Sequence, residues 1–280
     1  MLTPIRYAYY LSFPVVLGAV LSNRLAARLS DVDPIHWATP VVLALVVFII
    51  YTVDRLFDVR KAGVQTPLAQ LTPRHRFHRL YAARLWRIVV LAGLLVLGLV
   101  AVLPMSVIEF GLVLGGICAI YVGLVFRLPP GHSSLLLKEP LVALLYSAGV
   151  WGSVWVQRPV VRGVEVAEGI MFAAIAFQNL LLFALMENYE HPSRPDFSLA
   201  THWGESASLS VLSWLTLLVV GAAFTLCFVT DDRFAQRAAL MLGLMSLSLY
   251  TIQRYPAYFV RNERYRWLGD IVFWLPALVL

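Results

Sequence analysis

Long apolar runs, separated by short polar segments, follow one another along almost the whole chain. Nine of them approach about 20 residues, the length an α-helix needs to cross the hydrocarbon core of a bilayer. They lie near residues 7–27, 36–55, 86–104, 106–126, 136–156, 167–187, 206–229, 234–255 and 265–280. The pattern therefore predicts one all-α domain, residues 1–280, folded as a polytopic membrane bundle of about nine transmembrane helices.

The composition supports a membrane protein. Hydrophobic residues make up 60% of the chain and charged residues 14%, and the mean hydropathy is +0.77. A soluble domain of this size carries about 25% charged residues and could not hide so much apolar surface. These values exclude an ordinary soluble enzyme or binding domain.

The positive charge of the chain is concentrated beside the predicted spans. A net charge of +6 could indicate nucleic-acid binding, but basic residues next to spans favour anionic lipid head groups or an anionic substrate instead. No nucleic-acid partner is expected, and nothing in the sequence identifies a protein partner. Cys118 and Cys227 both fall inside spans without paired spacing, which argues against a disulfide framework and a zinc-thiolate site.

The distribution of basic residues also predicts an orientation. Most of the 22 lysine and arginine residues fall at the N-terminus or in the segments after the second, fourth, sixth and eighth runs. Because such residues favour the cytoplasmic side, we expect the N-terminus and these loops in the cytoplasm. We expect an integral protein of a bacterial inner membrane.

Two acidic pairs stand at the ends of apolar runs. Asp54 and Asp58 end the second run, and Glu187 and Glu190 end the sixth. Their spacings, i,i+4 and i,i+3, place each pair on one face of a helix. Like charges so close repel unless a cation lies between them, so two pairs on the same side of the membrane indicate a divalent-metal site. The alternative is that each pair is only a hydrated helix end.

Two other polar features leave alternatives open. Thr72–Arg79 (TPRHRFHR) is expected to begin a helix after Pro73, and its basic residues either set topology and bind anionic lipid or bind a diphosphate. Gln178 and Asn179 lie in the middle of the sixth run, and Asn179 shares a helical face with Glu187. These amides either line a cavity or form hydrogen bonds between helices.

The order of these features resembles the UbiA superfamily of intramembrane aromatic prenyltransferases. That family carries two Asp-rich motifs at the cytoplasmic ends of the second and sixth of nine helices. Asp54–Asp58 (DRLFD) matches the DRxxD end of the first motif, and Glu187–Glu190 (ENYE) with Ser198–Gly204 (SLATHWG) resembles the second. Tyr121–Arg127 is similar to the tyrosine and basic residue that follow the family's fourth helix.

The chain departs from the family pattern at several positions. Ile50 and Tyr51 stand where the first motif opens with Asn-Asp. Arg194 stands where the second motif has a third Asp, with Asp196 two places on, and the acids of this motif are Glu. A single metal ion, or an arginine in place of a metal, is compatible with the smaller number of carboxylates.

The resemblance implies that Mg²⁺ binds the diphosphate of an isoprenyl donor, so that the isoprenyl group passes to an aromatic or other lipophilic acceptor. The implied catalytic residues and metal ligands are Asp54, Asp58, Glu187 and Glu190, with Asp196 as a further ligand. The candidates for substrate contact are Arg55, Arg74, Arg76, Arg127, Lys138, Asn179 and Arg194. Tyr146, Trp151 and Trp155 are either aromatic walls for the isoprenyl tail or plain packing.

A second hypothesis is a UbiA-like membrane protein that has lost transfer chemistry and binds a lipid or a partner protein. A transporter is a weaker third hypothesis, because the acids lie at helix ends and charges in the middle of spans are scarce. The enzyme is favoured because acids are present at both matching helix ends.

Overall fold

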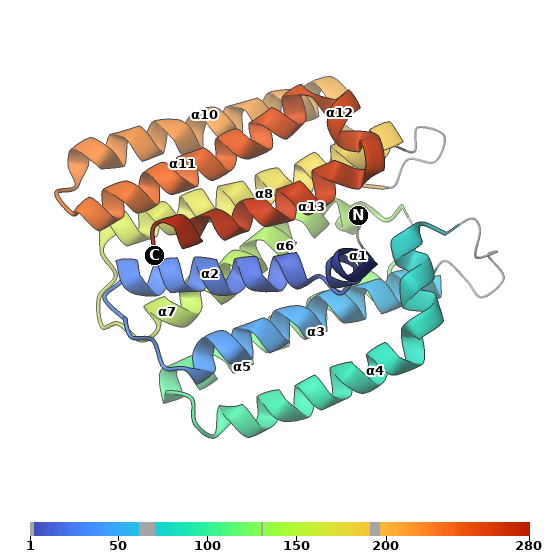
Figure 1. Ribbon diagram of the computed structural model, residues 1–280, viewed down its shortest axis with the longest axis horizontal. Helices are drawn as coiled ribbons and strands as arrows, with labels where there is room; N and C mark the ends of the chain where they lie inside the picture. The colour runs from blue at the N-terminus through green and yellow to red at the C-terminus, as the bar shows by residue number, and fades with distance from the viewer. Residues whose placement is uncertain (1–2, 62–70, 130, 191–196) are drawn as a thin grey trace.

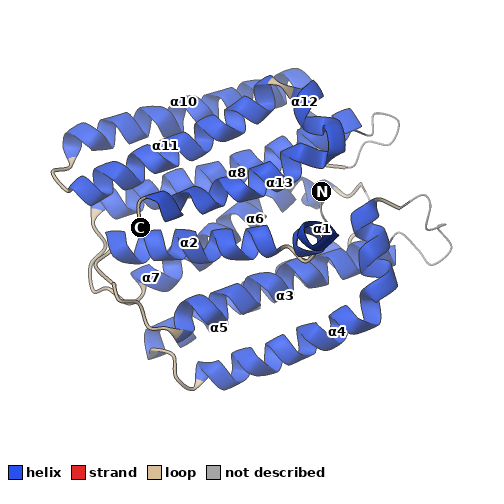
Figure 2. Cartoon of the chain, in the orientation of Figure 1, coloured by secondary structure: helices blue, strands red, loops and turns tan. Residues whose placement is uncertain are grey.

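Every regular element in the computed structural model is a helix, within the residues that it describes, 3–61, 71–129, 131–190 and 197–280 (Figure 2). The longer helices are α2 (Phe13–Leu29), α3 (Ala38–Lys61), α4 (Pro73–Val100), α5 (Met105–Arg127), α8 (Gly163–Glu190), α10 (Glu205–Val229) and α11 (Arg233–Arg254). The shorter ones are α1 (Thr3–Tyr10), η2 (Ser133–Leu137), α6 (Lys138–Ser147), η3 (Ala148–Gly152), α7 (Ser153–Trp155), α9 (Leu199–Trp203), α12 (Pro256–Val260), η4 (Arg261–Glu263), α13 (Arg264–Ile271) and η5 (Val272–Leu278). The all-α prediction is confirmed.

Six helical segments among the described residues are long and apolar enough to cross a membrane, so the chain is a candidate integral membrane protein. They are Ala38–Arg60, Pro73–Val100, Met105–Arg127, Ser133–Trp155, Gly163–Glu190 and Glu205–Val229. The other three predicted spans are helical as well, but they do not meet this criterion.

Each of these three segments fails the criterion of length and apolarity for a local reason. Residues 7–27 are interrupted at Ser12, whose positive φ of 57° separates α1 from α2 and leaves α2 with 17 residues. α11 carries Arg233, Gln236 and Arg237 in its first turns, which lowers its apolarity. Residues 265–280 are divided between α13 and η5, and η5 contains Pro276.

The long helices lie side by side in Figure 1, with α10 and α11 along one edge, α3 and α4 along the other, and α8 and α2 between them. α8 is the most enclosed span, since 67% of its apolar stretch is buried, against 6% for α5. The first turns of α4 cross the end of the bundle before the helix turns along its length. α8 is therefore the central rod, and α5 faces the surroundings.

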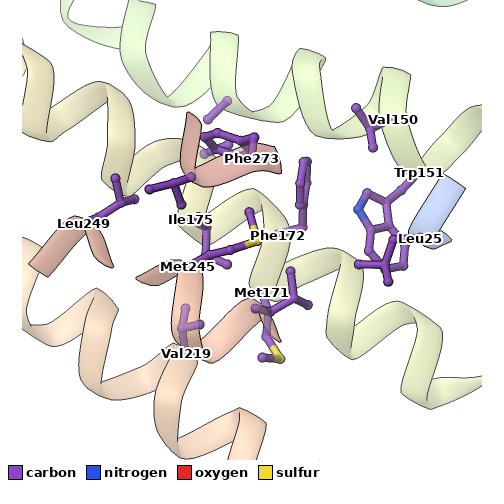
Figure 3. Packing of buried hydrophobic residues seen from close by; sticks show 14 of the residues in the cluster. Leu25, Val150, Trp151, Met171, Phe172, Ile175, Val219, Met245, Leu249 and Phe273 are labelled. Carbon is purple, nitrogen blue, oxygen red and sulfur yellow. The ribbon is translucent and has the colours of Figure 1, made fainter. Parts of the chain in front are cut away.

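Apolar side chains around α8 form the core of the bundle. Phe172 and Ile175 of α8 are fully buried and lie close to Phe273 of η5 and Met245 of α11 (Figure 3). The ring centroids of Phe172 and Phe273 are 5.6 Å apart with an edge-on geometry, which aromatic pairs favour. Trp151, which is 1% exposed, packs against Phe172 at the α6–α7 side.

A hydrogen-bonded group joins α8 to α10 and α11. Gln178 Nε2 donates to Thr216 Oγ1 at 2.9 Å, and Ser246 Oγ donates to Gln178 Oε1 at 2.7 Å. Because buried amides are costly unless they are bonded, these contacts fix the three helices against one another. Of the two alternatives for Gln178, a cavity wall or a hydrogen bond between helices, the structure shows the hydrogen bond.

The C-terminal segment packs along α2. Trp274 Nε1 donates to the carbonyl oxygen of Pro14 at 2.8 Å. Gly18 of α2 allows the close approach, because a Cβ at this position would lie 2.7 Å from Cβ of Phe273. This contact holds α13, and the charged residues that it carries, against the rest of the bundle.

Gly18→Ala should destabilise the protein by about 1–3 kcal/mol, since overpacking at a close backbone contact forces helices apart. The matched control is Gly221→Ala in α10, where an added Cβ has no neighbour within 4 Å. Melting curves in detergent should show a lower Tm for Gly18→Ala and an equal or higher Tm for Gly221→Ala. An unchanged Tm for Gly18→Ala would contradict the packing.

Candidate functional site

The two acidic pairs lie at the same end of the bundle. α3 and α8 both end there, and α4 begins there (Figure 1). Charges from both helices act on the same side chain: Arg55 is influenced by Asp54 and Asp58 of its own helix and also by Glu187 of α8. This end of the molecule, from α1, α3, α4, α8 and α13, is called the charged end below.

On α3, an arginine pairs with one of the acids. Arg55 Nη1 donates to Asp58 Oδ2 at 3.0 Å, and their side chains are 22% and 31% exposed. The pair is one turn apart on the same helix face, where opposite charges stabilise each other. Asp54 has no hydrogen bond to another described residue, although its charge acts on Arg55 and on Tyr121 of α5.

On α8, both acids bind residues of α13. An Arg266 guanidinium nitrogen donates to Glu187 Oε1, and the two side chains are 13% and 27% exposed. Tyr265 Oη donates to Glu190 Oε2 at 2.9 Å. The Arg266 guanidinium carbon also lies 5.1 Å from the centroid of the Tyr265 ring. The C-terminal helix is thereby tied to the second acidic pair by two consecutive residues.

A third arginine enters from the start of α4. Thr72 caps this helix, since its Oγ1 accepts a hydrogen bond from the His75 backbone N–H at 3.3 Å, and this fixes the first turn that carries Arg74. The like charges of Arg55 and Arg266 are the strongest charge influences on Arg74. Unlike those two, the Arg74 guanidinium makes no hydrogen bond or ion pair with another described residue. Three guanidinium groups therefore gather at the charged end.

The helix α1 closes over this group with a tyrosine. Tyr7 and Tyr10 pack on Phe77 of α4, with ring centroids 5.6 and 5.4 Å apart, and place α1 beside the arginines. Tyr9 is only 8% exposed, and its hydroxyl has no hydrogen-bond partner among the residues that the structure describes. Burial raises the pKa of Tyr9 to about 12, although Arg74 and Arg266 act to lower it. The hydroxyl is thus a protonated donor at neutral pH.

A small polar cavity of about 20 Å³ lies inside the bundle, and Tyr51, Tyr146, Asn179 and Asp270 are among its lining residues. The cavity is large enough for one water molecule. Neither Asn179 Oδ1 nor the Tyr146 hydroxyl has a hydrogen-bond partner in the described ranges. Arg55, Arg74 and Arg266 are the charges that act on Asp270, so this residue connects the cavity with the charged end.

A larger apolar cavity of about 400 Å³ lies between α3, α4, α5 and the α6–α7 segment; we call it the chamber. Its walls are mainly Val, Leu and Ile side chains. Tyr51 and Tyr146 line both the chamber and the small polar cavity. The volume lies in the range of small-molecule sites. Together, the charged end, the polar cavity and the chamber suit a molecule with an anionic head and an apolar tail.

The structure brings together most, but not all, of the residues that the sequence indicated. The charged end contains Asp54, Asp58, Glu187, Glu190, Arg55 and Arg74; Lys138 acts on Asp58, and Asn179 lines the polar cavity. Arg76 and Arg127 are exposed. Arg194 and Asp196 lie outside the described residues. Trp151 and Trp155 pack against α8 at Gly169 and line neither cavity. Of the three predicted aromatic wall residues, Tyr146 is the one that lines a cavity.

Sequence reasoning missed Tyr9, Tyr51, Tyr265, Arg266 and Asp270 as site residues. The available signal was weak. Arg264 and Arg266 stand at the start of a predicted span like many topology-setting residues, and Asp270 is a single acid without a second one at helical spacing. The partner of Glu187 is 79 positions away along the chain, beyond any helical spacing.

The described acids do not fit the magnesium site that the resemblance implies. Asp58, Glu187 and Glu190 already accept hydrogen bonds from Arg55, Arg266 and Tyr265. Within the described ranges, no three side chains of His, Cys, Asp or Glu come close enough together to hold a metal ion. Mg²⁺ needs several oxygen ligands in near-octahedral geometry, and here guanidinium and phenol groups bind those oxygens.

Comparisons with models of protein families, with characterised proteins and with solved structures found no match. Membership of the UbiA superfamily therefore stays a prediction from the motif residues.

Arg266→Met should lower the free energy of unfolding by about 1–3 kcal/mol, because it leaves Glu187 without its bonded partner in a partly buried place. The double variant Glu187→Gln/Arg266→Met removes both charges and should recover part of that loss. Melting curves in detergent for the wild type, the two single variants and the double variant measure the coupling. Strictly additive effects would show that the pair is not formed.

Proposed function

We propose that the protein is an intramembrane prenyltransferase that takes an isoprenyl diphosphate as donor and a lipophilic, for example aromatic, molecule as acceptor. The observation that carries this proposal is the sequence of adjoining sites: the chamber shares Tyr51 and Tyr146 with the polar cavity, and Asp270 of that cavity lies under the influence of the arginines of the charged end. An isoprenyl diphosphate has a compact polyanionic head and a long apolar tail.

The residues of the site would act mainly by binding and charge stabilisation. Arginines at the charged end would hold the diphosphate, and the chamber would take the tail out of water. In transfer, the bond between the first tail carbon and the diphosphate oxygen breaks, and that carbon bonds to the acceptor, which loses a proton. Guanidinium groups favour this step because they offset the charge that grows on the leaving diphosphate.

The orientation is part of the proposal. The charged end carries the basic residues at the end of α3 and in the first turns of α4, among them Arg60, Arg74 and Arg76, so we infer that it faces the cytoplasm. The water-soluble product, diphosphate, would then leave on that side.

The second candidate is a membrane protein that binds such an amphiphile without transferring it. The engagement of Glu187 by Arg266 and of Glu190 by Tyr265 favours this candidate, because one oxygen of each acid is already bonded to a side chain of α13. Both candidates share the binding site and differ in chemistry.

Turnover separates the two candidates. Purified protein in lipid nanodiscs is mixed with geranylgeranyl diphosphate and a panel of phenolic and lipid acceptors, and released diphosphate and prenylated product are measured. Product formation supports the enzyme. Binding of the donor without product across donors of shorter and longer tails would establish the binding protein instead.

Gly115→Phe should weaken binding of geranylgeranyl diphosphate about tenfold or more, because the ring occupies space that the tail needs. Gly115 lines the chamber, and an added Cβ there meets no atom within 4 Å, so the fold should tolerate the change. The matched control is Gly116→Phe, the next residue, which is equally open but does not line the chamber. Titration should show loss of affinity in the first variant only, and equal affinities would contradict the assignment of the tail.

A further inference from the structure

We propose that the charged end recognises a phosphate or diphosphate group without a metal ion, through Arg55, Arg74 and Arg266, and that Asp58 and Glu187 position two of these arginines instead of binding metal. This inference rests on the proposed function, since it concerns how the head group of the same ligand is held. The acidic motifs suggest metal ligands, whereas in this proposal their carboxylates hold the arginines that bind the ligand.

The first step is the arrangement of the ion pairs. Glu187 bonds one nitrogen of Arg266, and Asp58 bonds one nitrogen of Arg55. A guanidinium group has five N–H donors in a fixed planar fork, so most of the donors of both arginines remain for a ligand. The carboxylates hold the side chains in place and lower the entropy lost when a ligand binds.

The second step is Arg74. It brings a third positive charge close to Arg55 and Arg266, and no described acid is bonded to it. Because Arg55 and Arg266 are paired with Asp58 and Glu187, Arg74 is the guanidinium whose charge lacks a bonded described acid, and an anion beside it would supply that partner. A diphosphate is well suited, because its several oxygens can accept bonds from more than one guanidinium group.

The third step is a set of polar atoms without partners. The Tyr9 side chain is more than nine-tenths buried, and its hydroxyl has no hydrogen-bond partner within the described part of the chain; the same holds for the buried His75 Nε2. The charges of Arg74 and Arg266 act on Tyr9, and those of Arg74 and Arg55 act on His75. Buried polar atoms are nearly always bonded in native proteins, so these two indicate a ligand or water among the arginines.

Asp54 gives the sharpest contrast between the two modes of binding. If it holds a metal that bridges to the ligand, Asp54→Asn removes a ligand of the metal, and binding should collapse. If the arginines bind alone, Asp54 is a nearby negative charge that repels the anion. Asp54→Asn should then leave the affinity equal or raise it several-fold.

The main experiment is titration of the protein in nanodiscs of neutral lipid with geranylgeranyl diphosphate, in EDTA and in Mg²⁺. We expect affinities that agree within about threefold between the two buffers. Binding only in Mg²⁺ would overturn this inference and leave the proposed function standing. Binding in neither buffer, with donors of several tail lengths, would overturn both.

Arg74→Met tests the arginines directly and should fold, because it leaves no bonded acid behind. It should weaken binding in EDTA about tenfold to a hundredfold, the range for hydrogen bonds to charged groups. The control is Arg87→Met on the same helix, where an exposed arginine donates to the Ala83 carbonyl oxygen of its own helix. Equal affinities for Arg74→Met and the wild type in EDTA would contradict the proposal.

Two further arms identify the source of the phosphate group. Inorganic diphosphate should compete with geranylgeranyl diphosphate in EDTA if the site takes the head of a prenyl donor. If phosphatidylglycerol in the nanodisc displaces the donor instead, the recognition without metal holds, and the ligand is a lipid head group. Failure of both competitors would place the donor head elsewhere and overturn the assignment.

Discussion

A charged side chain at the end of an apolar helix needs a partner, because it has little water to solvate it and a low dielectric around it. In this protein the pair of Glu187 and Arg266 meets that need and also connects the central helix α8 to the C-terminal helix α13. The tyrosine next to Arg266 bonds the second acid of α8. The position of α13, and with it the polar cavity beneath the charged end, depends on this connection.

The same constraint explains why the charged end is assembled from distant parts of the chain. α1, α3, α4, α8 and α13 each bring one or a few polar groups to it. A single helix that carried all of these charges would not stay in an apolar environment. Dividing them among helices that meet at one end lets each rod remain apolar along most of its length.

The sequence predicted the helical class and the approximate positions of the main apolar helices, because length and hydrophobicity determine these, although α4 (Pro73–Val100) begins well before the predicted run at 86–104. It did not predict the break at Ser12, where a left-handed backbone divides one expected span. The sequence also predicted a span over α11. Whether this helix crosses the membrane depends on where its neighbours place the polar residues of its first turns. Helical period finds such segments but does not decide which of them cross a membrane.

For the site, the sequence located the acids but not what they bind. Helical spacing relates Arg55 to Asp58, whereas Arg266 and Tyr265 reach Glu187 and Glu190 only through the packing of η5 on α2. The two amides of α8 show the same limit. Gln178 and Asn179 are adjacent in sequence, but Gln178 bonds toward α10 and α11 whereas Asn179 lines the polar cavity. The packing of the neighbouring helices determines these two directions.

The contrast between α8 and α5 has a consequence for the membrane itself. α5 forms one wall of the chamber while almost none of its apolar stretch is buried, so that wall separates the chamber from lipid by a single helix. Acyl chains of the bilayer and the tail of a ligand therefore compete for similar apolar surroundings. The lipids of the bilayer therefore act both as solvent for the protein and as competitors for the chamber. The apparent affinity for any amphiphile should vary with the lipid composition around the protein.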